Sequence, residues 1–508
     1  MEKEPAKPAA AGGGGHDAAD VEEVSQAVDR IGLGLYHIVI LILAGGVYAV
    51  EAAIMLLAGF AVKTIYWKWE LSPFMYVALA FILVVGIYVG TICGGFLSDN
   101  YGRRLPILTT YAGVAVSLCL MGLALNYAMI LSLAFLLGLA MGLGHAACNT
   151  VVCESTPRKW QDFLICATFL LFAIGQIYAA CIFIVLSPEL EHRDVNWRQL
   201  LFMAAVPSAV FFVLAFLLLY ESPQWLVLVG RVTGKGEAQD VLYSLARFNA
   251  QPKDVATLDL RNIPEVVARE QPVTDDVGYF EGMVDSIAHT WHTLLRPLFS
   301  RRYARITITM CFANLAAYFF YYGMIYGMPD SFKAMEKELD DDETGMELTP
   351  ASAVLIAALA EIPGVIFAMT LGFSMGGPSI LCITFGLTTV SAAALIVTLH
   401  PVMTWIAKMF ITSAFIATYV FMLSAYPTQF RGTGFAFCVS VGRVGGLASP
   451  VLFEILMDKT GSIQAWFMIA ALLCLLATIM VTLLRISIAN DTEDEKQHAL
   501  ERSNSGRA

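Results

Sequence analysis

Apolar residues along this chain gather into long runs instead of alternating with polar residues. As helices that rise about 1.5 Å per residue, runs of roughly 20 residues cross a hydrocarbon core of about 30 Å. The pattern therefore predicts an all-α membrane protein with twelve transmembrane helices. The runs cover residues 34–61, 74–98, 105–125, 128–153, 163–186, 199–220, 304–328, 351–374, 378–399, 402–425, 434–456 and 463–486.

The twelve runs fall into two equal halves separated by one polar stretch. We expect two six-helix bundles joined by a connecting loop that carries an amphipathic stretch near residues 280–295. Both ends of the chain are polar and are predicted to be disordered and cytoplasmic. The predicted parts are an N-terminus (1–30), a first bundle (31–220), the cytoplasmic connecting loop (221–303), a second bundle (304–486) and a cytoplasmic tail (487–508).

The composition excludes several classes of protein. Hydrophobic residues make up 58% of the chain and charged residues only 14%, which excludes a soluble enzyme. The net charge of −11 argues against nucleic acid as a partner, and leaves the lipid bilayer and a small solute. The sequence has no phosphate-binding glycine loop and no Cys or His spacing suited to zinc. We therefore expect no cofactor, no metal site and no catalytic residues.

Lysine and arginine in the short loops set the expected orientation. When the twelve runs alternate, the basic loop residues collect on one side, which is the cytoplasmic side by the positive-inside rule. Both termini then lie in the cytoplasm. The residues are Arg103, Arg104, Arg158, Lys159, Arg231, Lys235, Arg301, Arg302, Arg305 and Arg431.

The opposite side receives an acidic segment, FKAMEKELDDDETGMEL, at residues 332–348. It carries seven acidic residues and two lysines. A solvated loop explains such a segment, and a vestibule that attracts cations is the alternative.

The segment GGFLSDNYGRR between the second and third runs has residues suited to a latch, that is, to a reversible contact between charged groups and another helix end. Asp99 ends one helix, and Arg103 and Arg104 begin the next, with Gly95 and Gly102 at regular spacing. A short loop of this kind fixes a carboxylate beside two guanidiniums, which can clamp another helix end in one conformation and release it in another. The alternative is a topogenic basic cluster with an incidental aspartate.

This segment resembles the signature of the major facilitator superfamily, G-x-x-x-D-R/K-x-G-R-R/K, with Asn100 in place of the usual basic residue. The equivalent loop of the second half, LGFSMGGPS at residues 371–379, has lost its acid and its arginines, so the second half is expected to be held differently. The segments CESTP, ESPQWL and YPTQFRGTGFAFCVSVGRVGGLASP resemble the sugar porter, organic ion transporter and synaptic vesicle two-related branches.

The resemblance implies a fold of two six-helix bundles and transport by alternating access. It adds Glu154, Glu221 and Arg431 to the latch residues. Together with the glycines, the implied gating set of the outward-open state is Gly95, Asp99, Gly102, Arg103, Arg104, Glu154, Glu221 and Arg431. The arginine usual near the start of the fourth helix is replaced by Gly138.

Four ionisable residues lie at membrane depth, where an ionised side chain costs about 2.5 to 3.5 kcal/mol and normally faces a cavity or a partner. Glu51 lies past the middle of the first helix and is predicted to serve proton coupling or cation contact; an inert acid near the outer interface is the alternative. Glu361 precedes Pro363 and Gly364, which weaken the helical ladder. It is either a solute ligand or a cap for the freed amides.

Lys408 lies about two turns inside Pro401, so it either contacts the solute or extends to the outer interface. Arg443 lies deeper, and its planar fork of donors suits a carboxylate, sulfate or phosphate. In the organic anion branch that the chain resembles, an arginine in this helix is thought to meet the substrate. The alternative for Arg443 is a buried pair with Glu51, Glu361 or another acid.

Tyrosines in the helices fit a small-molecule cavity lined by rings, although most are expected to pack. Tyr318 and Tyr322 are the two that we assign to the substrate site, beside Arg443, Glu361 and Lys408. His145 in the fourth helix is either a proton relay or a packing residue.

The resulting hypothesis is a secondary active transporter of a small polar organic solute, with an organic anion or zwitterion favoured, a hexose second, and protons as the coupling ion. A facilitator without proton coupling is a variant of the same class. The alternative class is a receptor or scaffold that keeps the fold and has lost transport, which the missing second latch favours. The membrane is that of the cell surface or of an organelle or vesicle.

Overall fold

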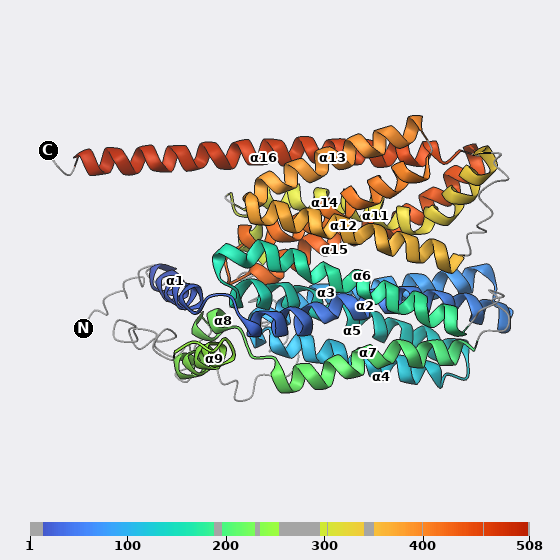
Figure 1. The fold of residues 1–508 in the computed structure, drawn as a ribbon, viewed down its shortest axis with the longest axis horizontal. Coiled ribbons are helices and arrows are strands. Elements are labelled where there is room, and N and C mark those ends of the chain that lie inside the picture. Colours follow the sequence, from blue (N-terminus) through green and yellow to red (C-terminus); the bar gives the residue numbers. More distant parts are fainter. Residues whose placement is uncertain are drawn as a thin grey trace, which may run out of the picture.

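The computed structural model describes residues 14–186, 196–228, 234–252, 295–301, 303–339, 350–398, 400–460 and 462–505. Within these ranges the chain is helical and contains no strand. The helices form two bundles that lie side by side with their long axes roughly parallel (Figure 1).

The first bundle contains six long helices. They are α2 (Leu35–Lys68), α3 (Pro73–Tyr101), α4 (Arg104–Gly122), α5 (Tyr127–Ser155), α6 (Gln161–Leu186) and α7 (Trp197–Leu218). The second bundle contains α11 (Ala304–Leu339), α12 (Pro350–Ser374), α13 (Gly377–Val397), α14 (Pro401–Ala425), α15 (Arg431–Thr460) and α16 (Gln464–Ser505).

Eleven of these helices are long and apolar enough to cross a membrane, and the described apolar part of α12, Ala358–Ser374, makes the twelfth. Large apolar side chains such as Phe74, Val390 and Leu217 are more than 60% exposed, as expected of surfaces that face lipid. The predicted twelve-helix membrane fold is confirmed.

Polar side chains begin several helices by accepting hydrogen bonds from first-turn amides. Ser72 Oγ accepts from the Met75 N–H at the start of α3. Asn126 Oδ1 accepts from the Met129 N–H at the start of α5. These caps fix where the apolar runs become helices.

Small residues allow close helix packing within each bundle. A Cβ on Gly90 of α3 would stand 2.1 Å from the Leu139 carbonyl oxygen of α5, and a Cβ on Gly445 of α15 would stand 2.3 Å from the Leu315 carbonyl oxygen of α11. Such near contact of backbones is typical of membrane helix pairs. The helices of each bundle are therefore closely packed against one another.

Three shorter helices collect at one end of the molecule, where the end of α16 also projects (Figure 1). They are α1 (Gly14–Ile31), α8 (Pro223–Leu228) and α9 (Gly234–Phe248); the one-turn helices η1 (Arg158–Trp160) and η5 (Arg296–Phe299) complete the described elements.

The structure corrects the predicted termini. The expectation of disorder over residues 1–30 is wrong for residues 14–30, which belong to α1: Val24, Ala27 and Val28 are buried there, and Arg158 pairs with Glu22 at 2.5 Å. The spacing i, i+3, i+4 of these apolar residues is that of an amphipathic helix. The predicted disordered tail at 487–508 is likewise helical as far as Ser505.

Parts of two predicted segments lie outside the described residues. In the connecting loop 221–303, the structure describes α8, α9 and η5, whereas most of the amphipathic stretch near 280–295 is outside the described part. Of the acidic segment 332–348, residues 332–339 end α11 and the remainder is outside it.

Candidate functional site

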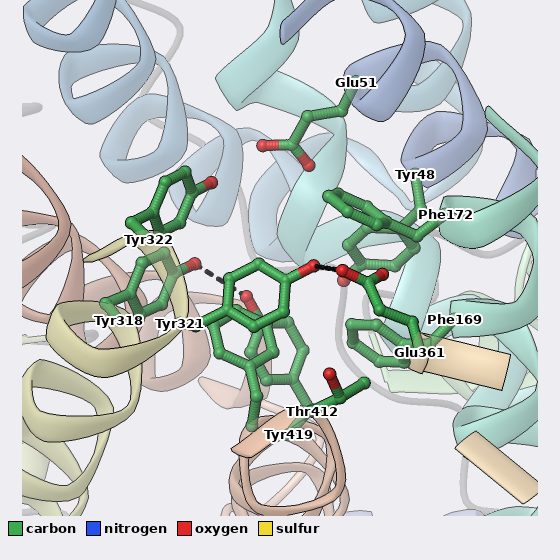
Figure 2. A pocket seen from close by; sticks show the side chains of 11 residues that line it. Tyr48, Glu51, Phe169, Phe172, Tyr318, Tyr321, Tyr322, Glu361, Thr412 and Tyr419 are labelled. Carbon is green, nitrogen blue, oxygen red and sulfur yellow. Dashed lines mark hydrogen bonds between the residues drawn. The ribbon is translucent and has the colours of Figure 1, made fainter. Parts of the chain in front are cut away.

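A small cavity lies between the two bundles, near the middle of the helices that line it (Figure 2). The volume open to the centre of a water molecule is about 20 Å³, which is room for one or two waters. The lining residues come from α2, α6, α11, α12 and α14: Tyr48, Glu51, Phe169, Phe172, Tyr318, Tyr321, Tyr322, Glu361, Thr412, Phe415 and Tyr419.

One carboxylate of the cavity is paired with a lysine of the same bundle. Lys408 Nζ of α14 stands 3.1 Å from Glu361 Oε1 of α12 and 3.6 Å from the centroid of the Tyr321 ring. Tyr321 donates a 2.6 Å hydrogen bond to the same oxygen, and Gln176 Nε2 of α6 donates one of 3.3 Å across the bundle interface. The Lys408 side chain is fully buried, so it does not extend to the outer interface.

The other carboxylate is held between two basic groups. Glu51 Oε2 of α2 stands 2.6 Å from His145 Nε2 of α5, within the first bundle. Glu51 Oε1 stands 3.7 Å from a guanidinium nitrogen of Arg443, which belongs to α15 of the second bundle. Arg443 Nε has no hydrogen-bond partner among the described residues. The long separation and the unpartnered Nε leave the pair with Glu51 loose, while Arg443 also interacts with the Tyr318 phenol.

Aromatic rings fill the space between the two charged groups. Tyr318 and Tyr322 stack at 5.7 Å between ring centroids, and the Tyr318 hydroxyl hydrogen-bonds with the Tyr419 hydroxyl at 2.8 Å. Tyr48 of the first bundle stacks on Phe169 at 4.7 Å. Figure 2 shows Glu51 and Glu361 approaching this ring cluster from different helices. The cavity thus offers apolar faces in the middle and charges at its edges.

A second polar cluster joins the two bundles at the end of the molecule that carries α1, α8 and α9. Asp99 at the end of α3 accepts hydrogen bonds from the Gly432 N–H at 3.2 Å and from the Thr433 N–H and hydroxyl at 2.7 and 2.8 Å. All three donors lie in the first turn of α15, where the helix dipole also favours an anion.

Arg103 and Glu154 continue this cluster. Arg103 donates two hydrogen bonds to Glu154, at 3.0 and 3.1 Å, and one of 3.2 Å to the Thr428 carbonyl of the second bundle. Arg431 of α15 donates to the other side of the interface, 3.2 Å from Glu154 Oε1. Arg103 and Glu154 have no exposed side-chain surface. The positive and negative charges of this cluster therefore cancel only when the two bundles are in contact.

The remaining predicted gating residues shape the first bundle locally. Glu221 accepts hydrogen bonds from the N–H groups of Arg103 and Arg104, and burial raises the pKa of its carboxyl group above the usual value. Gly102 has φ +98°, a conformation that favours glycine, and a Cβ there would stand 2.3 Å from Glu221 Oε2. Arg104 also donates to the Phe216 carbonyl at 2.7 Å, within the first bundle.

The structure thus brings the predicted residues together in two groups. Arg443, Glu361, Lys408, Tyr318 and Tyr322 gather with Glu51 at the cavity. Asp99, Arg103, Glu154 and Arg431 form the cluster between the bundles, with Gly95 packed against α15, whereas Gly102, Arg104 and Glu221 contact the first bundle.

Sequence reasoning left three contributors unassigned. His145 is predicted to be either a proton relay or a packing residue, and its contact with Glu51 is not predicted, because no single-sequence pattern links two residues so far apart in the chain. Gln176 and Thr433 carry no charge to draw attention, yet both bind carboxylates across the bundle interface. For Gln176, the signal available in the sequence was a polar residue inside an apolar run.

Known proteins share this architecture. The family model described as "Sugar (and other) transporter" matches residues 46–496. The synaptic vesicle 2-related protein of Xenopus laevis is 25% identical over 500 residues, covering 94% of this chain and 83% of the relative. The organic cation/carnitine transporter 7 of Arabidopsis thaliana is 26% identical over 457 residues, covering 84% and 87%.

Two solved structures show the same fold. The proton:xylose symporter XylE bound to 6-bromo-6-deoxy-D-glucose superposes with a TM-score of 0.65 at 14% identity, covering 87% of this chain and 94% of that one. The transporter FucP in its outward conformation gives a TM-score of 0.56 at 13% identity, covering 88% and 99%. The family match spans most of the chain, so this protein belongs to the sugar (and other) transporter family and is a multi-pass membrane transporter of the major facilitator superfamily.

Proposed function

We propose that this chain is a secondary active transporter that moves a small organic anion or zwitterion by alternating access, with a proton exchanged at the Glu51 site. The observation that carries the proposal is the cavity between the bundles, which is lined by two carboxylates and aromatic rings, with a lysine and an arginine paired to those carboxylates. Charges at this depth are costly unless they serve a solute or an ion pathway.

The state of the two basic groups favours an anionic group on the solute at the Arg443 end. Lys408 Nζ and Arg443 Nε both lack a hydrogen-bond partner among the described residues, but Lys408 stands 3.1 Å from Glu361, whereas Arg443 stands 3.7 Å from Glu51. A guanidinium with free donors suits a planar carboxylate. The rings beside it offer faces for an apolar or ammonium part of the same solute, which is the chemistry of a zwitterion.

A sugar is the second candidate. The family description and the sugar bound to the similar symporter support it. Aromatic faces such as Tyr318 and Tyr322 fit the apolar face of a pyranose ring. Most of the phenol hydroxyls in the described lining, however, already hydrogen-bond to other protein groups, which leaves few unengaged neutral partners for a ring of hydroxyls. These phenols are Tyr48, Tyr318, Tyr321 and Tyr419.

The cluster around Asp99 and Arg103 is proposed as the cytoplasmic gate. By the positive-inside rule, the basic end of the molecule faces the cytoplasm, with both termini on that side. Hydrogen bonds from the first turn of α15 to Asp99, and the pair of Arg431 with Glu154, close this end. Rocking of the two bundles about the cavity then requires that these bonds break.

The test is uptake into proteoliposomes preceded by a thermal-shift screen against organic anions, zwitterions, organic cations and sugars at two pH values, since a ligand of the folded state raises the apparent melting temperature. We expect a shift with an anion or zwitterion that Arg443→Ala abolishes and Arg443→Lys weakens, while both variants remain folded. A shift with sugars alone would establish the second candidate. Folded protein without any shift or uptake would favour the receptor or scaffold hypothesis.

A further inference from the structure

Glu51 has one basic partner in each bundle, and the two partners differ in chemistry. His145 Nε2 stands 2.6 Å from Glu51 Oε2 in the first bundle, and Arg443 of the second bundle stands 3.7 Å from Glu51 Oε1. Arginine stays charged at all relevant pH values, whereas an imidazole exists in a neutral and in a protonated form. The carboxylate therefore has one permanent and one conditional counter-charge.

We propose that His145 is the proton-dependent residue that decides whether Glu51 ties the two bundles together at the cavity, and that its proton is taken up together with the anionic group of the solute. The proposal rests on the proposed transport function. It assigns a role to His145, the partner of Glu51, in addition to the Glu51 carboxylate.

Charge balance among the three buried groups carries the argument. With a neutral imidazole, the charges of Glu51 and Arg443 cancel, and the ion pair that cancels them crosses the bundle interface. With a protonated imidazole, His145 neutralises Glu51 within the first bundle, and the Arg443 charge is left without compensation. A buried uncompensated charge is costly. An anionic group of the solute beside Arg443 restores the balance, so one proton and one negative charge bind cooperatively.

The surroundings of His145 leave a place for that proton. Its side chain is 1% exposed, and Nδ1 has no hydrogen-bond partner among the described residues, so this nitrogen is free to take a proton while Nε2 keeps its contact with Glu51. The proton is taken from water and is returned to water after transport. No other atom changes its bonds.

The neighbouring helices bring few other charges to this position. On α2 the groups are Tyr48, whose ring lies 5.8 Å from the imidazole, and Glu51; on α5 the Cys148 thiol donates to the His145 carbonyl. Further phenols interact with Cys148, Glu51 or Arg443: Tyr111 of α4, Tyr318 and Tyr322 of α11, and Tyr419 of α14. On α3, Gly90 and Gly94 meet the α5 backbone at Leu139 and Leu143. Arg443 is the cation supplied by α15.

The test uses the full-length protein in lipid nanodiscs without solute. Spin labels on genetically encoded amino acids at the exposed positions Glu70 and Thr398 report the distance between the outer ends of the bundles. In the wild type, lowering the pH from 8 to 5.5 is expected to shift the distances from short to long, by up to about tenfold in population ratio per pH unit for one linked proton. His145→Gln, which keeps a donor for Glu51 but cannot titrate, should stay short throughout.

Two further variants make the outcome decisive. Glu51→Gln removes the carboxylate and should give long distances at every pH, and His37→Gln, at a buried histidine bonded to the Ser155 carbonyl, should keep the wild-type response. A pH shift that persists in His145→Gln, or a wild type that shows none, overturns the inference. The proposed function fails separately, if no solute is taken up although the pH shift of the wild type depends on His145.

Discussion

The two halves of the chain contact each other at the same end of the molecule with different chemistry. The connection between α3 and α4 places Asp99 and Arg103 against the start of α15. The equivalent connection between α12 and α13 places Phe373 against η1 and the start of α6, where its ring lies 5.3 Å from that of Trp160 and 5.9 Å from Lys159 Nζ. The first half thus contributes a charged latch, formed by Asp99 and Arg103 at α15. The second half contributes an aromatic latch, formed by Phe373 against Trp160 and Lys159.

The difference shows that the two halves of one fold can hold the same end of the molecule together by different interactions. The charged latch is dry: Arg103 and Glu154 have no exposed surface, so opening it requires solvation of several charges at once. The aromatic latch is partly exposed, since 52% of Phe373 is accessible, and it holds no charge that must be solvated when the bundles separate. We expect the charged latch to set the closed state and the aromatic contact to persist through the cycle.

The largest effect should follow from Asp99→Ala. The substitution removes the acceptor of three hydrogen bonds from α15 and the second carboxylate beside Arg103, which keeps Glu154 at 3.0 Å. Loss of these hydrogen bonds to a charged group should destabilise the latched state by about 3–5 kcal/mol. Maleimide labelling at pH 7 of a cysteine introduced at Ser440, a buried site on α15 between the latch and Arg443, measures the opening. Peptide mass spectrometry separates this site from the native cysteines.

The control for that substitution is Asp99→Asn, which keeps an acceptor oxygen and should label at an intermediate rate. Equal labelling of Asp99→Ala and the wild type would show that the charged latch does not hold the closed state. The comparison between the two latches would then lose its basis.

Gly95→Ala should open the same latch by a steric route. A Cβ at Gly95 would stand 2.6 Å from the Ala436 Cβ and 2.9 Å from the Gly432 carbonyl oxygen, so α3 and α15 must separate. Overpacking of this kind costs about 1–3 kcal/mol, and about 1.4 kcal/mol is tenfold in an equilibrium. We expect the labelling of Ser440→Cys to rise about tenfold. Unchanged labelling would mean that the two helices do not meet here.

Much of the fold follows from the sequence, because the bilayer requires long apolar helices and the sequence shows them directly. The twelve helices and the spacing of the charged latch were predictable from local patterns. The helix α1 was missed since its apolar positions are few, at Val24, Ala27, Val28 and Ile31, and the flanking segment is rich in Ala, Gly and charge.

The pairing inside the site could not be predicted from the sequence. Glu51, His145 and Arg443 lie on three helices, and no local pattern states which helices face each other. Their predicted roles stay predictions, although the structure gathers them around one carboxylate. The aromatic latch was hidden for another reason: the loss of charge in residues 371–379 is visible, but the partner Trp160 lies in the other half.

Trp160→Ala tests the aromatic latch and should have a smaller effect than either change in the charged one. The indole contacts the Phe373 ring at 5.3 Å and Lys159 Nζ at 5.7 Å, and a partly exposed aromatic and cation–π set of this size contributes about 1 kcal/mol. We expect the melting temperature to fall slightly and the labelling of Ser440→Cys to change less than threefold, with Trp160→Phe close to the wild type. Labelling as fast as in Asp99→Ala would make the two latches equivalent.

Gly372→Ala is the matched counterpart of Gly95→Ala and should have the smallest effect. Both glycines lie within helices that lead to a latch, so alanine brings the same gain in helix propensity to each. A Cβ at Gly372, however, would stand 3.4 Å or more from Asp162, which is ordinary van der Waals contact. We expect labelling and melting temperature to remain within about 0.5 kcal/mol of the wild type. The two substitutions differ in what the new methyl group meets. A large effect at Gly372 would therefore show that the second latch also depends on close backbone contact. The proposed difference between the charged and the aromatic latch would then be wrong.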